Sequence, residues 1–235
     1  MLLSSVELEN FTLQNSHTQT AFMKNILMLV ALFLVFISCS PSKQETNTTT
    51  VSTPTVQNTS NQDVMDYLNI PGPVHYDGKD FKLAWSSHPT PEYYKQEYLP
   101  GDEKPESYNQ MILIELAIGD LNVKDIAASK KNEIESRKAG DPVASYQSST
   151  EKSGDDIFDF MLSQDFGLEN GIVEWNVYRY IPYTDSSGKK GIALYALSQR
   201  AYGKNSEAFV SDIKANREKY ISTFLSSGRP EIKLK

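Results

Sequence analysis

The chain has 235 residues, of which 39% are hydrophobic and 23% are charged, a composition typical of a globular protein rather than of a coiled coil or a collagen. Its formal net charge of −7 argues against nucleic-acid binding, which depends on Lys and Arg neutralising phosphates. The single cysteine excludes an intramolecular disulfide, and three histidines offer few ligands for zinc. We therefore expect neither a metal nor a cofactor.

The first 22 residues form a separate segment. They include Glu7 and Glu9, although a secretory signal begins with net positive charge. We predict that translation starts at Met23, with Lys24 as the basic residue, and that residues 1–22, if they are made, form a disordered extension.

Residues 26–37 are an unbroken run of twelve apolar residues. As a helix this run would span roughly 18 Å, which is too short for the ~30 Å hydrocarbon core that a transmembrane helix crosses. Its length and the preceding Lys24 are typical of the hydrophobic region of a signal peptide. We therefore assign residues 23–38 to a signal peptide.

The residues that end this run are Phe36-Ile37-Ser38-Cys39. They resemble the lipobox of bacterial lipoproteins, although Phe36 replaces the more common leucine. The resemblance implies diacylglyceryl transfer to the thiol of Cys39 and cleavage before that residue. It also implies a lipid anchor in the cell envelope, on the periplasmic face of the outer membrane if the cell is Gram-negative.

Residues 39–62 follow as a lipidated cysteine and a tether. Of the 23 residues from Ser40 to Gln62, 17 are Ser, Thr, Asn or Gln. Such a segment cannot bury a hydrophobic core, so we expect a flexible linker. The remaining residues, 63–235, are enough for one folded domain.

Two segments of that domain have helical periodicity. Residues 122–139 begin with Asn122 as a helix-capping residue and end before Gly140 and Pro142. Residues 205–227 carry the stronger apolar stripe and end at Gly228 and Pro230. We expect both helices to pack their apolar faces on a sheet.

The other periodic segments are typical of strands. Residues 172–183 and 191–202 flank the turn sequence Asp185-Ser186-Ser187-Gly188 and predict a long hairpin. Before them, Phe81, Leu83 and Trp85 alternate onto one side of an early strand. The further expected strands are residues 93–99, 111–117, 143–147 and 157–163.

These elements predict an α+β fold with an antiparallel sheet of about six to seven strands and two packing helices. The element order, together with the aromatic early strand around Trp85, resembles the PsbP/Mog1/DcrB-like α/β/α sandwich proteins over residues 81–225. That resemblance implies a mostly non-catalytic protein, such as an assembly factor or an accessory subunit.

Motifs for common chemistry are absent from the sequence. It contains no phosphate-binding glycine loop, no H-E-x-x-H and no G-x-S-x-G. The acidic residues Asp155, Asp156 and Asp159 lack the spacing of a calcium loop, so we expect a solvated strand entry. His75 and His88 have no partner at catalytic spacing and are expected in exposed loops.

One polar face remains as a candidate binding site. Alternation places Glu174, Asn176, Tyr178 and Tyr180 on one side of the predicted hairpin, opposite Arg200 on its second strand. Tyr and Arg are common anchors at interfaces, so this face could bind a glycan, a peptide or a protein. The simpler interpretation is that tyrosine favours strands and that Glu174 pairs with Arg200.

Three functions remain open. We favour a non-catalytic envelope lipoprotein that binds a partner protein or a cell-wall component. An enzyme that uses carboxylate, Tyr and Arg groups on the hairpin of residues 172–202 is the first alternative. A carrier of a small ligand between sheet and helix is the second.

Overall fold

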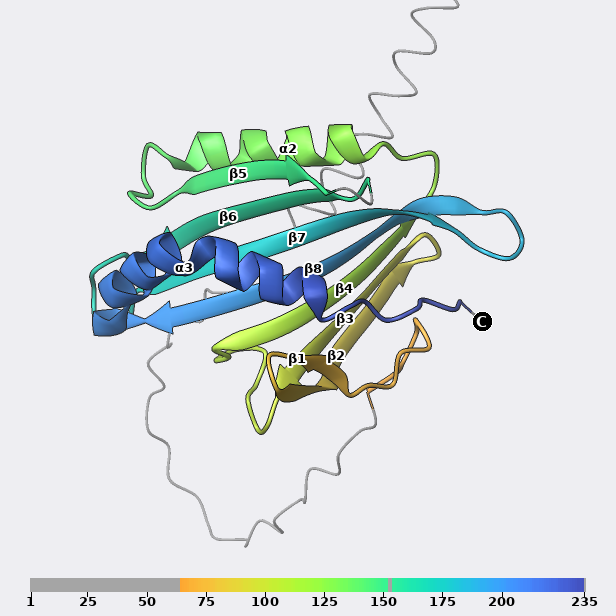
Figure 1. Ribbon diagram of the computed structural model, residues 1–235, viewed down its shortest axis with the longest axis horizontal. Helices are drawn as coiled ribbons and strands as arrows, with labels where there is room; N and C mark the ends of the chain where they lie inside the picture. The colour runs from red at the N-terminus through yellow and green to blue at the C-terminus, as the bar shows by residue number, and fades with distance from the viewer. Residues whose placement is uncertain (1–63, 152–153, 235) are drawn as a thin grey trace, which may run out of the picture. The chain divides into compact units, whose positions relative to one another are not determined.

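The computed structural model describes residues 64–151 and 154–234 (Figure 1). Strands are the commonest secondary structure in this part of the chain. The strands are β1 (Val74–Tyr76), β2 (Lys79–Thr90), β3 (Tyr93–Pro100), β4 (Gln110–Ile118), β5 (Ser145–Thr150), β6 (Asp156–Gln164), β7 (Ile172–Thr184) and β8 (Lys190–Tyr202). The helices are α2 (Val123–Arg137) and α3 (Ser206–Ser226), with a short 3₁₀ turn, η2 (Gly203–Asn205), before α3.

All eight strands form one antiparallel sheet in the order β1-β2-β3-β4-β8-β7-β6-β5. The sheet is strongly curled, and its two helices cover only part of it (Figure 1). The expected fold of six to seven strands in a PsbP/Mog1-like sandwich was therefore wrong. The three-residue strand β1 was missed because it lies among Pro and Gly residues. The sandwich was wrong because two helices are too few to cover both faces of an eight-stranded sheet.

The two helices lie on opposite faces of the sheet, because each packs with a different hydrophobic cluster. We call the face under α3 the inner face; there Val210, Ile213 and Phe224 are buried against strand residues such as Trp175. We call the face under α2 the outer face; there Ile134 is buried, and α2 packs on β5, β6 and β7. Both apolar stripes predicted from helical periodicity are confirmed.

The predicted hairpin is also confirmed. Strands β7 and β8 pair continuously from Ile172–Tyr202 to Thr184–Lys190. The turn is held by Asp185, whose side chain accepts hydrogen bonds from the backbone N–H groups of Ser187 and Lys189 at 2.8 and 2.9 Å. Because the register is fixed, the alternation of β7 side chains between the two faces is fixed as well.

Strand β2 departs from the predicted alternation. An irregularity in the pairing of β2 with β3 separates Leu83, which faces Tyr98, from Trp85, which faces Glu97. An extra residue in one strand moves the following side chains to the other face of the sheet. Trp85 consequently lies on the outer face, 39% exposed, instead of in the core beside Phe81.

Candidate functional site

The lipidation site predicted at Cys39 lies outside the described residues. The five residues of the predicted binding face lie inside them, and the structure places all five on the outer face. Glu174, Asn176, Tyr178 and Tyr180 follow one another along β7, and Arg200 of β8 is the direct cross-strand partner of Glu174. Together with neighbouring residues they form two clusters, in which the pKa of the central carboxyl shifts in opposite directions.

The first, the Glu174 cluster, consists of Tyr108, Glu174, Asn176, Ser198 and Arg200. The guanidinium Nε of Arg200 donates to the Glu174 carboxylate. The hydroxyl of Tyr108 donates to the same carboxylate at 2.8 Å, and Nδ2 of Asn176 donates at 2.9 Å. The guanidinium of Arg200 also lies 4.1 Å from the centre of the Tyr108 ring, within the range of a cation–π contact.

These contacts keep Glu174 ionised. Burial alone would raise the pKa of its carboxyl, but the charge of Arg200 and the hydrogen bonds from Asn176, Arg200 and Tyr108 outweigh burial and lower the pKa. In turn, although burial opposes its charge, the neighbouring Glu174 raises the pKa of Arg200. A carboxylate already engaged by three donors has no proton to give near pH 7 and is a poor base.

Sequence reasoning missed Tyr108, the residue that closes this cluster. It lies between β3 and β4 and is only 2% exposed, with its hydroxyl also 3.0 Å from Oγ of Ser198. Its backbone carbonyl accepts a hydrogen bond from Tyr202 at 2.7 Å. The loop therefore packs Tyr108 against the β7–β8 hairpin. The only feature of the sequence that could have indicated this contact is an aromatic residue in a polar, charged loop.

The second, the Glu115 cluster, consists of Tyr93, Glu115, Tyr178 and Tyr180. Glu115 of β4 faces Leu194 of β8, and Leu194 faces Tyr180 of β7, so Glu115 and Tyr180 lie in one row across three strands. Tyr178 lies two residues before Tyr180, with the two ring centres 6.0 Å apart. On β3, Lys95 is the direct cross-strand partner of Glu115, and Tyr93, opposite Ala117, forms a hydrogen bond with Glu115.

Burial dominates the electrostatics of the Glu115 cluster. It raises the pKa of Glu115 despite the nearby charges of Lys95 and Lys130 and a hydrogen bond with Tyr93. Burial and the Glu115 charge also raise the pKa of Tyr93, Tyr178 and Tyr180. The pKa values of Glu115 and Glu174 thus shift in opposite directions: burial outweighs the nearby lysine charges at Glu115, whereas Arg200 and three hydrogen bonds outweigh burial at Glu174.

Two lysines flank the Glu115 cluster, and each is paired with a glutamate of its own. Lys95 forms an ion pair with Glu97 at 2.8 Å and lies 5.6 Å from the centre of the Trp85 ring. Lys130 of α2 forms an ion pair with Glu133 at 2.7 Å and lies 6.0 Å from the Tyr178 ring. Counting Glu115, the cluster and its flanks hold three carboxylates and two ammonium groups.

Glu115 was also missed by sequence reasoning. It interrupts the apolar sequence MILIELAI of residues 111–118, which we read as a buried central strand. A lone acidic residue in such a run was the available signal, because a buried carboxylate is costly unless it has partners.

Two acidic residues before and within β6 form buried ion pairs with arginines. Asp159, 4% exposed, accepts hydrogen bonds from Arg217 of α3, and Asp155, 6% exposed, accepts two from Arg179 at 2.6 and 2.9 Å. The solvated strand entry expected here was therefore wrong for these two residues. Within residues 64–151 and 154–234, no group of three or more His, Cys, Asp or Glu residues could hold a metal ion.

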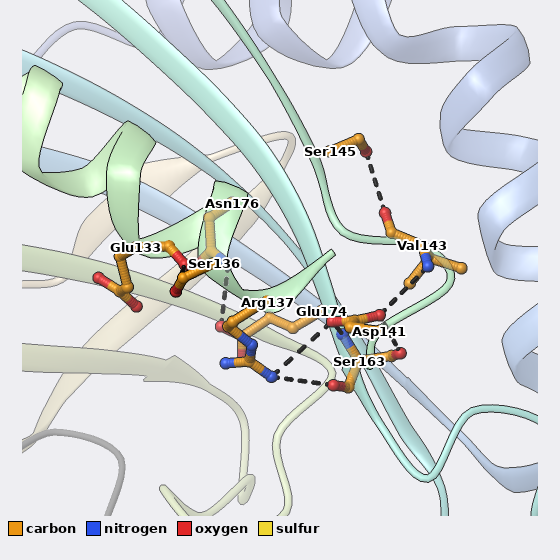
Figure 2. A network of polar contacts seen from close by, with 9 residues as sticks. All are labelled: Glu133, Ser136, Arg137, Asp141, Val143, Ser145, Ser163, Glu174 and Asn176. Atoms are coloured by element: carbon orange, nitrogen blue, oxygen red, sulfur yellow. Dashed lines mark hydrogen bonds and ion pairs between the residues drawn. The ribbon is translucent and has the colours of Figure 1, made fainter. Parts of the chain in front are cut away.

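The C-terminal end of α2 is fixed by a polar network (Figure 2). Asp141 accepts hydrogen bonds from the backbone N–H and the hydroxyl of Ser163 on β6, both at 2.6 Å. Arg137 donates to the Ser163 carbonyl at 3.0 Å. This network fixes the end of α2 on β6, and Lys130 of α2 lies 6.0 Å from the Tyr178 ring on the neighbouring β7.

His75 and His88 lie in strands, not in the loops expected from the sequence. His75 of β1 pairs with Asp80 at 2.5 Å, and both side chains are largely exposed. His88 of β2 stacks on Tyr94 with 4.0 Å between ring centres. Neither contacts a residue of the two clusters through these interactions.

The domain is thus a mostly-β protein with one curled antiparallel sheet. The two polar clusters on the outer face of this sheet are its candidate binding site. A protein-family model matches residues 68–227, so the chain belongs to that family, whose description states no activity. No curated protein and no solved structure gives a significant match. Among the described residues, no helix is both long and apolar enough to cross a membrane.

Proposed function

We propose that this chain is an envelope lipoprotein, anchored by acyl chains on Cys39, whose domain binds another envelope component without catalysing a reaction. The observation that supports a binding role is the state of Glu174. This carboxylate was the best candidate for acid/base chemistry, yet it is engaged by Arg200, Tyr108 and Asn176. Its lowered pKa fits an ion pair that shapes a surface.

The remaining outer face has the composition of a recognition surface. Trp85 is 39% exposed, and Tyr93, Glu115 and Tyr178 are half-buried. Aromatic side chains with a polar tip are favoured where one face must contact a partner and the other must pack in the protein.

Anchoring is tested by growing the native host with an alkyne analogue of palmitate and comparing wild type, Cys39→Ala and Ser40→Ala. We expect label on wild type and Ser40→Ala and none on Cys39→Ala, because only the thiol can accept the diacylglyceryl group. Equal labelling of Cys39→Ala would contradict a lipid anchor at this residue.

Binding is tested by crosslinking in intact cells, with a photoreactive amino acid in place of Trp85 on the outer face or of Thr184 at the end of β7. We expect a discrete crosslinked product from position 85 and only background from position 184. The same product pattern from both positions would count against the outer face as the binding surface.

A further inference from the structure

The sheet is open, and its two edge strands are β1 and β5. On one side β5 pairs with β6 over all six of its residues. On the other side it has no backbone partner among the described residues, because no backbone hydrogen bond outside the β5–β6 ladder begins or ends at residues 145–150. Five of its six side chains are exposed. Alternate N–H and C=O groups along this edge are therefore available to another strand.

Strand β5 has none of the features that usually keep an edge strand unpaired. Its sequence, SYQSST, contains no charged residue, proline or glycine, and its register with β6 is continuous. Edge strands that must stay single are commonly very short, or carry lysines, prolines or bulges. Strand β1 at the opposite edge is of that kind, since it has only three residues and directly follows Pro73. The contrast indicates β5 as the edge that accepts a partner.

The charges beside β5 differ between its two ends. Near its amino-terminal end, Lys131 of α2 and Lys138, the C-cap of that helix, lie 5.5 and 5.1 Å from the centre of the Tyr146 ring. At its carboxyl-terminal end, the Thr150 hydroxyl donates to the carboxylate of Asp156 at 2.8 Å. Tyr146 and Thr150 are an even number of residues apart, so both ends present these charges on the outer face.

Neighbouring residues leave this difference in sign in place. Lys138 also forms an ion pair with Glu135 at 2.9 Å, so Lys131 is the excess cation at the amino-terminal end. Residues 151–152 follow β5 with opposite formal charges and cancel, so Asp156 is the excess anion at the other end. A second β5 in antiparallel orientation therefore brings lysines to Asp156 twice, whereas a parallel one brings like charges together.

We propose that this chain forms a two-fold dimer in which β5 of one copy pairs antiparallel with β5 of a second copy. The sheet then continues from one copy into the other, and the central residue, Gln147 or Ser148, faces its own copy. The two-fold axis is perpendicular to the sheet, so both outer faces lie on the same side and can contact one partner surface together. Dimerisation depends neither on the lipid anchor nor on the ligand of the outer face, so these proposals can fail separately.

The first test is sedimentation equilibrium of the full-length chain in a density-matched non-ionic detergent. We expect a reversible monomer–dimer equilibrium with a Kd on the order of micromolar, because a six-residue edge is a small interface. A chain that stays monomeric up to roughly 100 μM, which is far above such a Kd, would overturn the proposal and leave β5 to a strand of another protein.

A pair of matched variants locates the interface. Gln147→Lys/Ser148→Lys places like charges opposite each other at the axis, and we expect it to weaken the dimer at least about tenfold. The control, His75→Lys/Asp80→Asn, adds the same two positive charges at the opposite edge, where both side chains are largely exposed, and should leave the dimer unchanged. Equal effects of the two variants would overturn β5 as the interface, as would a β5 variant that dimerises like wild type through residues 26–37.

A charge exchange tests the antiparallel arrangement. Lys131→Glu/Lys138→Glu and Asp156→Lys each place like charges at both contacts, so we expect each variant alone to dimerise roughly three- to tenfold more weakly than wild type. Mixed together, they form a heterodimer with opposite charges at both contacts. With one variant fluorescently labelled, its association with the other should return to within about twofold of wild type. No recovery on mixing would overturn the antiparallel pairing of two copies.

Discussion

Glu115 and Glu174 lie on the same face of one sheet, about two strands apart, and experience opposite environments. Glu174 has a guanidinium and two further donors in contact, whereas at Glu115 burial outweighs the charges of Lys95 and Lys130 and a hydrogen bond with Tyr93. Desolvation disfavours an ionised carboxylate unless a cation or hydrogen bonds offset it. The contrast predicts different effects of pH and of substitution at the two positions.

The raised pKa of Glu115 makes its ionisation a cost to folding. In the folded state this carboxyl binds its proton more tightly than in the unfolded chain, so its contribution to stability falls as pH rises through the unfolded pKa toward the folded one. We expect Glu115→Gln to melt at a higher temperature than wild type at pH 8. At pH 4 the difference should largely disappear, because both side chains are then mostly neutral. Calorimetry at the two pH values checks this, and an equal difference at both would contradict it.

At Arg200 the expected effect is a loss of stability. Arg200→Ala leaves the Glu174 carboxylate without its cation and removes the contact with the Tyr108 ring. Breaking a fully buried pair costs about 3–5 kcal/mol; these side chains are 26% and 24% exposed, so we expect on the order of 2 kcal/mol, measured by urea unfolding.

A second substitution checks the mechanism. Adding Glu174→Gln to Arg200→Ala removes the unpaired charge, so the double variant should recover part of the lost stability. If the two losses simply add, the pair is not coupled as the structure indicates.

Among the elements, α3 depends on an ion pair as well as on its apolar stripe. Arg217 donates to Asp159 of β6, which also accepts a hydrogen bond from the Trp175 indole at 3.2 Å. We expect Arg217→Ala to raise amide exchange across α3 more than across α2, because it leaves a largely buried carboxylate short of a cation.

The matched control for that experiment is Arg229→Ala. Its guanidinium lies 3.9 Å from Asp155 and is 45% exposed, so the pair contributes little. Exchange in α3 should be nearly the same as in wild type. Similar amide exchange in both variants would show that the apolar face of α3 alone keeps the helix packed on the sheet.

Both helices and seven of the eight strands, including the β7–β8 hairpin, could be predicted from periodicity and turn residues. The limits of this reasoning appear at particular residues. A local irregularity moved Trp85 to the other face, and no pattern of alternation encodes such a shift. Glu115 and Tyr108 acquire their roles from segments that are distant in sequence, so local patterns could not assign them.

At the scale of the whole molecule, residues 60–235 form one compact unit. Together with the polar composition of residues 40–62, this predicts that the fragment 63–235 folds alone. We expect its melting temperature to lie within roughly 2–4 °C of that of the full chain, which corresponds to about 1 kcal/mol for a domain of this size. A fragment that is unfolded or melts well below the full chain would show that the preceding residues contribute to the core.

The first and last described segments of the domain are joined on the inner face. The backbone N–H of Lys233 donates to the Leu68 carbonyl at 3.1 Å, and the N–H of Leu68 donates to Gln96 on β3 at 2.8 Å. Any mechanical load that reached the domain from residues 1–63 would meet this junction before it met the large strands. Force applied through that end would thus first separate the carboxyl-terminal tail from Leu68 and leave the pairing of the eight strands unchanged.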